Sequence, residues 1–408
     1  MGVAGIATAD MPVIHAGRKE FVSKIVDQSR AKLATRLAFV AAGFGVACWA
    51  PLVPYAKARC QVDDGTMGLI LLLLGVGSIV AMPLAANLCG RFSSRPVVFV
   101  GGTGLAIVLP LLSVASSPVT LGAALFVFGA SLGSLDVAMN LYAVDLERAS
   151  EKPLMSSFHA LFSIGSFLGS GSVTALLSRR FAPSVSTTLC STVLIALVLF
   201  AMPRMFENRE AQSQPMFAVP KGVVLSIALL AAVSFLVEGA LLDWSALLLV
   251  AERLLSPARA GLGYMLFSIA MTFGRLIGDR IVARFGNFTV LTCGGLTALL
   301  GLCMLLLAPV APVALGGILL VGLGAANIVP ILFRLAGTQH AMPKGLAVAA
   351  LTTAGYGGML IGPAVIGFLS KEIGLHNAFW FLAALLISVP ALSRHVTSEG
   401  LPHQTGMT

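Results

Sequence analysis

GVVLSIALLAAVSFLVEGALLDWSALLLV, residues 222–250, is a long apolar stretch in which only Glu238 and Asp243 carry a charge. A transmembrane helix needs about 20 consecutive apolar residues, because the hydrocarbon core of a bilayer is about 30 Å thick. The pattern recurs along the whole chain of 408 residues, of which 57% are hydrophobic and 11% charged. Soluble domains carry about 25% charged residues. The sequence therefore predicts an all-α polytopic membrane protein.

The apolar stretches predict about twelve transmembrane helices, in two groups of six. The predicted helices are 34–56, 66–89, 96–114, 118–144, 154–178, 185–203, 222–250, 258–283, 288–308, 312–335, 345–369 and 376–393. The predicted domains are an N-terminal tail (1–33), a first six-helix bundle (34–204), a polar linker (205–221), a second bundle (222–394) and a C-terminal tail (395–408).

Several classes of function are excluded by what the chain lacks. Its six cysteines show no CxxC or metal-ligand spacing, HExxH is absent, and little length is left for a soluble catalytic or output domain. We therefore predict no metal, no cofactor and no enzymatic activity. The net charge of +9 is not arranged as basic residues interleaved with aromatic ones, so we predict basic loops at a lipid surface and no nucleic-acid partner.

The positions of Lys and Arg predict the orientation in the membrane. With the N-terminus inside, most of the basic residues fall in loops on the cytoplasmic side, among them Arg91, Arg95, Arg204, Arg284 and Arg394. Cytoplasmic loops carry an excess of Lys and Arg. This bias predicts a multi-pass protein of the bacterial inner membrane with both termini in the cytoplasm.

The two halves are related by a shift of 193 positions at several places along the chain. The shift places Gly68-Leu69 on Gly261-Leu262, Arg91-Phe92 on Arg284-Phe285, and Gly101-Gly102 on Gly294-Gly295. Near the fourth helix the shift becomes 191, where Asp136 meets Asn327. Repeated halves with a solute site between them are the architecture of alternating-access transporters.

Ionisable residues inside the predicted helices are the candidates for function, because a charge at the bilayer centre is costly unless it faces a cavity or a partner. Asp136 shares one face of the fourth helix with Asn140 and two glycines, and His159 lies at a similar depth in the fifth helix. The depths allow Asp136 and His159 to meet as a proton-handling pair. The alternative is that these groups only join two helices by hydrogen bonds.

The second half adds further charges. Glu238 lies deep in the seventh helix and is predicted to be a buried or protonated acid that lines the cavity. Asp243-Trp244, about one turn further, is interpreted as an anchor at the membrane surface. Arg275 and Asp279 are spaced as an i,i+4 ion pair near the cytoplasmic end, which is interpreted as a latch or a topology signal.

Polar and aromatic side chains from several other helices are candidate substrate ligands, with routine packing as the alternative for each. These candidates are Asn140, Trp49, Asn327, Tyr356 and Thr352. Such groups bind a hydroxylated solute by hydrogen bonds and stacking. The nearby prolines, including Pro51, Pro54, Pro330 and Pro363, are expected to bend their helices.

Over nearly its whole length the chain resembles the major facilitator superfamily. Copies of that superfamily's loop signature follow helices two and eight as Cys89-Gly90-Arg91-Phe92-Ser93 and Ala283-Arg284-Phe285-Gly286. Both copies keep the arginine and lack the acid before it. The resemblance implies two pseudo-symmetric six-helix bundles and gives Arg91, Arg275, Asp279 and Arg284 a role in gating at the cytoplasmic loops.

A second resemblance is to the fucose:proton symporter-like branch, which includes a group associated with rhizopine uptake. It is carried by Gly133-Ser134-Leu135-Asp136-Val137-Ala138-Met139-Asn140, by Glu147-Arg148 and by Ser156-Ser157-Phe158-His159. The resemblance implies that Asp136 takes part in proton coupling and that His159 stands where the symporters have a sugar-binding glutamine. The essential acid of their first helix is missing, since 39–55 contains no acid.

Together these observations predict a monomeric secondary transporter that moves a small polar, sugar- or cyclitol-like solute with protons, by alternating access. Asp136, His159 and Glu238 are the predicted proton-coupling residues. The alternative is a proton-driven exporter of an antibiotic or amphiphilic metabolite. An intramembrane enzyme or a sensor is the alternative from a different class.

Overall fold

The computed structural model describes residues 12–150, 154–205 and 219–398, which are helical apart from short connections. In this part of the chain, eleven helices are long and apolar enough to cross a membrane. One of them, α9 (Leu262–Leu306), contains a non-helical residue, Gly286, and therefore supplies two crossings. The predicted all-α polytopic fold with twelve crossings is thus confirmed.

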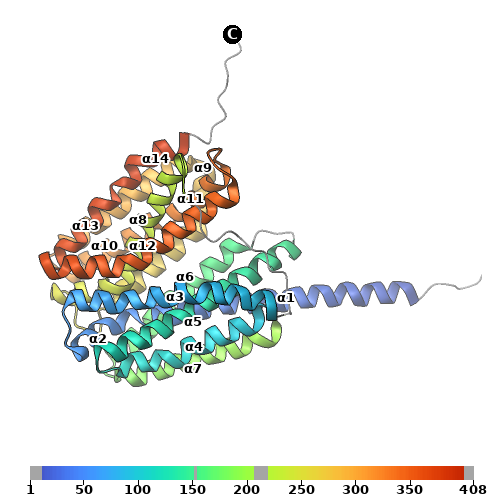
Figure 1. Cartoon of the computed structure of the whole chain (residues 1–408), viewed down its shortest axis with the longest axis horizontal. Coiled ribbons are helices and arrows are strands. Elements are labelled where there is room, and N and C mark those ends of the chain that lie inside the picture. The colour runs from blue at the N-terminus through green and yellow to red at the C-terminus, as the bar shows by residue number, and fades with distance from the viewer. Residues whose placement is uncertain (1–11, 151–153, 206–218, 399–408) are drawn as a thin grey trace, which may run out of the picture.

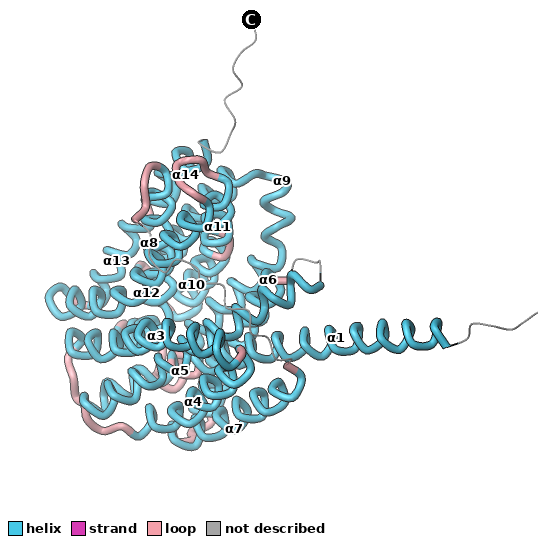
Figure 2. The backbone as a smooth tube through the Cα atoms, turned by 45° about the vertical axis from the view of Figure 1, so that its right-hand side comes forward, coloured by secondary structure: helices cyan, strands magenta, loops and turns pink. Residues whose placement is uncertain are grey.

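The helices divide into two consecutive sets. The first set is α1 (Pro12–Ala47), η1 (Ala50–Leu52), α2 (Val53–Cys60), α3 (Asp64–Phe92), α4 (Ser94–Val114), α5 (Pro118–Ser150), α6 (Met155–Ser178), α7 (Pro183–Ala201) and η2 (Met202–Arg204). The second set is α8 (Val223–Ala251), α9, α10 (Ala311–Ala325), α11 (Ile328–Thr338), α12 (Lys344–Ile373), α13 (Leu375–Leu386) and α14 (Ser388–Ser398). Figure 1 shows each set gathered into its own bundle, and Figure 2 shows loops mainly where helices end.

Three of the predicted spans, 34–56, 312–335 and 376–393, are interrupted, and each interruption is followed by proline. Pro51 lies in the first turn of η1 and Pro54 in the first turn of α2. Pro330 and Pro390 lie in the first turns of α11 and α14. A proline fits the first turn of a helix, where its missing N–H has no partner to lose. Residues 12–33 of the predicted N-terminal tail are helical, because α1 runs without a break from Pro12 into the first span.

The two ends of the molecule differ in their charged residues. We call the end that carries Arg91, Arg95, Arg284, Arg334 and Arg394 the basic end. We call the opposite end, which carries Asp63, Asp64 and Lys371, the far end. Each crossing runs from one end to the other, so a residue's depth follows from its place along its helix.

The halves meet where α3 packs against α12 and α6 packs against α9. A Cβ atom on Gly68 of α3 would lie 2.9 Å from the Cα of Gly367 of α12. A Cβ atom on Gly261 would overlap the side chain of Thr174 of α6. Gly261 and Gly367 lie 193 positions after Gly68 and Thr174, so the repeat found in the sequence also relates the two contacts between the halves.

The turns after α3 and inside α9 repeat the same backbone geometry. Ser93 has φ 83° and ψ 158°, and Gly286, again 193 positions later, has φ 78° and ψ 162°. Arg91 lies over the ring of Phe92, with 5.2 Å between guanidinium and ring centre, and Arg284 lies over Phe285 at 5.5 Å. Only glycine adopts this backbone conformation without strain.

We therefore expect Gly286→Ala to lower the free energy of unfolding by about 1–3 kcal/mol, because alanine is strained at this positive φ. The site is open, with no atom within 4 Å of an added Cβ, so a clash cannot explain a loss. Gly337→Ala in α11 is the matched control, since its added Cβ is equally free but the backbone is helical. Thermal unfolding of the purified proteins measures both. Equal melting temperatures for the two variants would contradict this account of the turn.

Candidate functional site

Asp136 of α5 is held by hydrogen bonds from both halves of the molecule. The Tyr356 hydroxyl of α12 donates to Asp136 Oδ2 at 2.7 Å, and Asn140 Nδ2 donates to Oδ1 at 3.1 Å. All three side chains are half-buried. The sequence predicted each of these residues separately, and the structure brings them together in one cluster.

Arg275 of α9 is the cation of a second cluster. Its Nη1 donates to Ser163 Oγ of α6 at 2.9 Å, and its Nη2 lies 3.8 Å from Glu238 Oε2 of α8. The Arg275 and Glu238 side chains are 22% and 18% exposed. The other carboxylate oxygen of Glu238, Oε1, is buried without a partner. Arg275 therefore links the halves through Ser163 and offsets the charge of Glu238.

The predicted pairing of Arg275 with Asp279 is wrong. Asp279 is 76% exposed and accepts from Arg334 of α11 at 3.3 Å. Residues spaced i,i+4 on a helix are neighbours, but a long arginine side chain can instead turn toward an acid on another helix. Here Arg275 points into the bundle, and Asp279 lies on its surface near the basic end.

His159 lies near the start of α6 with its ring edge-on to Phe39 of α1, at 5.3 Å between ring centres. Its side chain is exposed, and Arg275 is close enough to act on it electrostatically. In the part of the chain that the structure describes, no hydrogen bond or ion pair joins His159 to Asp136. The predicted meeting of the two is therefore not seen, and a role for His159 in proton coupling stays a prediction.

The other predicted ligands divide into two kinds. Asn327 caps the break between α10 and α11 and donates to the Gly274 carbonyl at 3.1 Å, which joins α11 to α9. Thr352 donates to the Val348 carbonyl within α12, one turn from Tyr356. Trp49 is completely buried, and its Nε1 has no hydrogen-bond partner. The N–H donor of Trp49 thus remains unused, whereas Asn327 and Thr352 donate to backbone carbonyls of helices.

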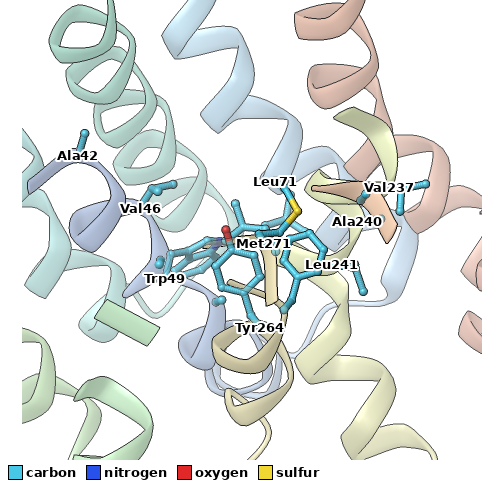
Figure 3. Packing of buried hydrophobic residues seen from close by; sticks show 14 of the residues in the cluster. Ala42, Val46, Trp49, Leu71, Val237, Ala240, Leu241, Tyr264 and Met271 are labelled. Carbon is cyan, nitrogen blue, oxygen red and sulfur yellow. The ribbon is translucent and has the colours of Figure 1, made fainter. Parts of the chain in front are cut away.

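The interpretation of Asp243-Trp244 as a surface anchor is wrong. Trp244 is completely buried and Asp243 is 6% exposed. The Trp49 indole lies beside the Asp243 carboxyl. Figure 3 shows Trp49 and Tyr264 turned toward one another between the halves. Sequence reasoning missed this cluster because an Asp-Trp pair near a helix end is typical of the membrane surface.

Ion pairs close the far end, and the sequence analysis missed them. Lys371 of α12 lies 3.0 Å from Asp63, the N-cap residue of α3, and so joins the two halves. Asp64 pairs with Lys57 and accepts from the Ser370 hydroxyl. The backbone N–H and hydroxyl of Thr66, together with Lys371, lower the pKa of Asp63 to about 2. The signal in the sequence was Asp63-Asp64 at the start of a helix, where the helix dipole favours acidic residues.

Comparison with known sequences gives consistent matches along the chain. The family model described as Major Facilitator Superfamily matches residues 36–344 and 227–406. An uncharacterised MFS-type transporter of Yersinia pestis is 46% identical over 367 residues, which make up 90% of this chain and 96% of that protein. The membrane protein MosC of Rhizobium meliloti is 27% identical over 366 residues, 88% of this chain and 89% of that protein.

Solved structures share the fold at low sequence identity. A D-xylose–proton symporter superimposes with a TM-score of 0.70 at 16% identity, covering 93% of this chain and 99% of that one. The nucleoside transporter NupG superimposes with a TM-score of 0.67 at 12% identity, covering 91% of this chain and 99% of that one.

The Arg275 cluster predicts a difference between two arginine substitutions. We expect Arg275→Ala to lower the free energy of unfolding by about 1–3 kcal/mol, because Glu238 and Ser163 then lose their partner inside the bundle. Arg334→Ala, which breaks the exposed pair with Asp279, should cost less than about 1 kcal/mol. Chemical unfolding in detergent compares the two variants. A loss for Arg334→Ala as large as that for Arg275→Ala would count against the buried cluster.

Proposed function

The chain belongs to the major facilitator superfamily, and we propose that it carries a small polar, sugar- or cyclitol-like solute across the bacterial inner membrane together with protons. The family consists of transporters, so the protein is a membrane transporter of small molecules and not an enzyme. We further propose that it belongs to the fucose:proton symporter-like branch and acts as a monomer.

The observation that carries the proposal is the hydrogen bond from Tyr356 to Asp136. It joins α12 of the second half to α5 of the first half, inside the membrane-spanning region. A hydrogen bond to an ionised carboxylate is about twice as strong as one between neutral groups. Proton binding to Asp136 therefore weakens a hydrogen bond between the halves. A proton gradient can in this way shift the equilibrium between arrangements of the two halves.

The polar side chains of the two clusters suit a solute rich in hydroxyl groups. Asn140 and Tyr356 present an amide and a phenol, while Arg275 and Glu238 supply a donor and an acceptor from the second half. Each of these four side chains keeps part of its surface accessible. The same fold in a D-xylose–proton symporter supports this solute class and coupling for the present chain.

The mechanism that we propose is a rocking of the two halves about this central site. By the excess of Lys and Arg in cytoplasmic loops, the basic end faces the cytoplasm and the far end faces outward. The structure then represents the state closed to the outside, because α3 packs on α12 and Asp63 pairs with Lys371 there. Opening the far end separates these contacts. The equivalent contact between Gly261 and Thr174 of α6 separates with them.

Transport in proteoliposomes tests the coupling. We screen polyols and sugars for uptake with and without an imposed inward proton gradient, and then compare Asp136→Asn with the wild-type protein. The variant should lose accumulation against a concentration gradient, because its side chain no longer binds a proton, and it should keep solute exchange across the membrane. Glu372→Gln is the matched control, since Glu372 is an exposed acid near the far end of α12.

The assignment of Asp136 is contradicted if Asp136→Asn still accumulates solute under the gradient with a normal pH dependence. Solute movement outward in exchange for protons would instead support the alternative, an exporter.

The far-end ion pair makes a separate prediction. Lys371→Gln should raise the rate at which a maleimide labels Ala364→Cys, because Ala364 lies buried between α3 and α12 and becomes accessible only when they part. An increase of up to a few-fold is expected for one exposed pair. The exposed Cys293 and half-buried Cys303 are first replaced by serine. Lys344→Gln, at the other end of α12, is the control.

The low pKa of Asp63 gives this contact a defined pH range. Because the carboxyl has a pKa of about 2 in the folded protein and of about 4 when unfolded, the contacts of Asp63 with Thr66 and Lys371 stabilise the folded protein fully above pH ~4. The effect is lost as the pH falls through about 2. If Lys371→Gln labels no faster than the parent protein at neutral pH, Asp63–Lys371 does not hold the far end closed.

A further inference from the structure

Asp243 is a buried acid for which the proposed transport cycle has no role so far. It lies five residues beyond Glu238 on α8, which places it about 7–8 Å nearer the far end. The residue is 6% exposed, and its Oδ1 is buried without a hydrogen-bond partner. An ionised carboxylate in such a position is strongly disfavoured unless a cation or several donors compensate it.

The groups around Asp243 come from both halves. Trp49, the N-cap residue of η1 in the first half, lies beside the carboxyl. Tyr264 of α9 lies close enough to feel the charges of Asp243, Glu238 and Arg275. Figure 3 shows the rings of Trp49 and Tyr264 turned toward one another here. Asp243 is therefore enclosed at the boundary that separates when the far end opens.

The nearby cations are engaged elsewhere. Arg275 contacts Glu238 and Ser163. On α2, Lys57 pairs with Asp64, and Arg59 donates to the carbonyls of Leu112 and Ala115.

Tyr356 of α12 and His376 of α13, on helices that pack against α8, are also engaged, while Arg394 and His395 of α14 lie near the basic end. On α12, Tyr356 donates to Asp136, and on α13, His376 pairs with Glu252 at the far end of α8. Of the two acids of α8, Glu238 and Asp243, only Glu238 is thus paired with the guanidinium of Arg275.

The surroundings favour a proton over a metal ion as the missing partner. Hard cations need about six or more oxygen ligands. Besides its own carboxyl, the site offers the Tyr264 hydroxyl, while Trp49 supplies only an N–H. A proton on Asp243 removes the uncompensated charge and needs no further ligand.

We propose that Asp243 is a second proton-binding site of this transporter, which holds its proton while the far end is closed and releases it when that end opens. In the closed state the proton is bonded to a carboxyl oxygen of Asp243. When the halves part at the far end, water reaches the carboxyl, the O–H bond breaks, and the proton passes to that water. The resulting carboxylate is hydrated, so closure requires that a proton be bound again.

This inference rests on the proposed function for its place in the cycle, but not for the protonation itself. It predicts that protons drive closure of the far end as well as acting at Asp136. The two acids would then exchange protons by different routes, and Asp243 would exchange its proton with water at the far end.

Infrared spectroscopy of the purified protein at neutral pH tests the protonation. The difference spectrum between the wild-type protein and Asp243→Asn should contain the carbonyl band of a protonated carboxyl. The matched difference for Glu372→Gln should lack it, because that acid is exposed to water. If the Asp243→Asn difference shows no such band, the proposal is wrong. Should this variant not fold, Trp49→Phe takes its place. Removal of the polar indole N–H beside the carboxyl changes the surroundings of the band and should shift it, and an unshifted band contradicts the proposal.

Labelling of Ala364→Cys tests the link to closure. As the pH is raised from mildly acidic to mildly alkaline, the labelling rate should rise several-fold in the otherwise wild-type protein. Each rate is divided by that of exposed Cys293 in a separate protein that carries Cys303→Ser alone, which corrects for the thiolate fraction. In Asp243→Asn the corrected rate should stay low and constant, because asparagine resembles the protonated acid. An equal rise in the variant contradicts the proposal.

Neither readout uses a solute or a proton gradient. Loss of gradient-driven uptake by the wild-type protein would therefore refute the proposed function without touching the protonation of Asp243. Absence of the infrared band would refute this inference and leave the coupling at Asp136 intact.

Discussion

The cost of an ionised group inside a lipid-embedded bundle governs the arrangement of this molecule. Each of the interior acids is dealt with differently. Asp136 receives two hydrogen bonds, Glu238 lies beside the single guanidinium of Arg275, and Asp243 has neither kind of compensation for its Oδ1. These groups lie near the contacts between the two halves, where a relative movement changes their surroundings. Charge and conformation are coupled for that reason.

The repeat explains why the two contacts between the halves resemble each other. The contact of Gly68 with Gly367 and that of Gly261 with Thr174 are equivalent under the same shift of 193 positions. Small residues allow the backbones of two membrane helices to approach closely. Both contacts lie toward the far end, where the ion pair of Asp63 with Lys371 is also found. Closure at this end thus depends on backbone packing strengthened by charge.

Much of the fold could be predicted from the sequence, because apolar length decides where helices cross a bilayer. The bend expected at Pro330 is a break between α10 and α11, whereas the break before Pro390 was missed, since apolar composition continues through it. Within the site, Asp136, Asn140 and Tyr356 were identified one by one from the rarity of polar groups in apolar helices. Their grouping was not, because it depends on how α12 packs across the boundary between the halves.

The same limit explains the errors. Arg275 was paired with Asp279 from spacing along one helix, yet its guanidinium reaches Glu238 on another helix and Ser163 in the other half. Asp243-Trp244 was placed at the membrane surface from composition, whereas the neighbouring η1 segment covers it with Trp49. In both cases the deciding contact is tertiary.

The central claim is that a proton bound inside the bundle travels with the solute, and proton movement itself tests it most directly. In weakly buffered proteoliposomes without an imposed gradient, adding a transported solute outside should make the external medium more alkaline, as protons enter with it. The change should disappear in Asp136→Asn. Solute uptake with no change in external pH, in the wild-type protein, would contradict the account.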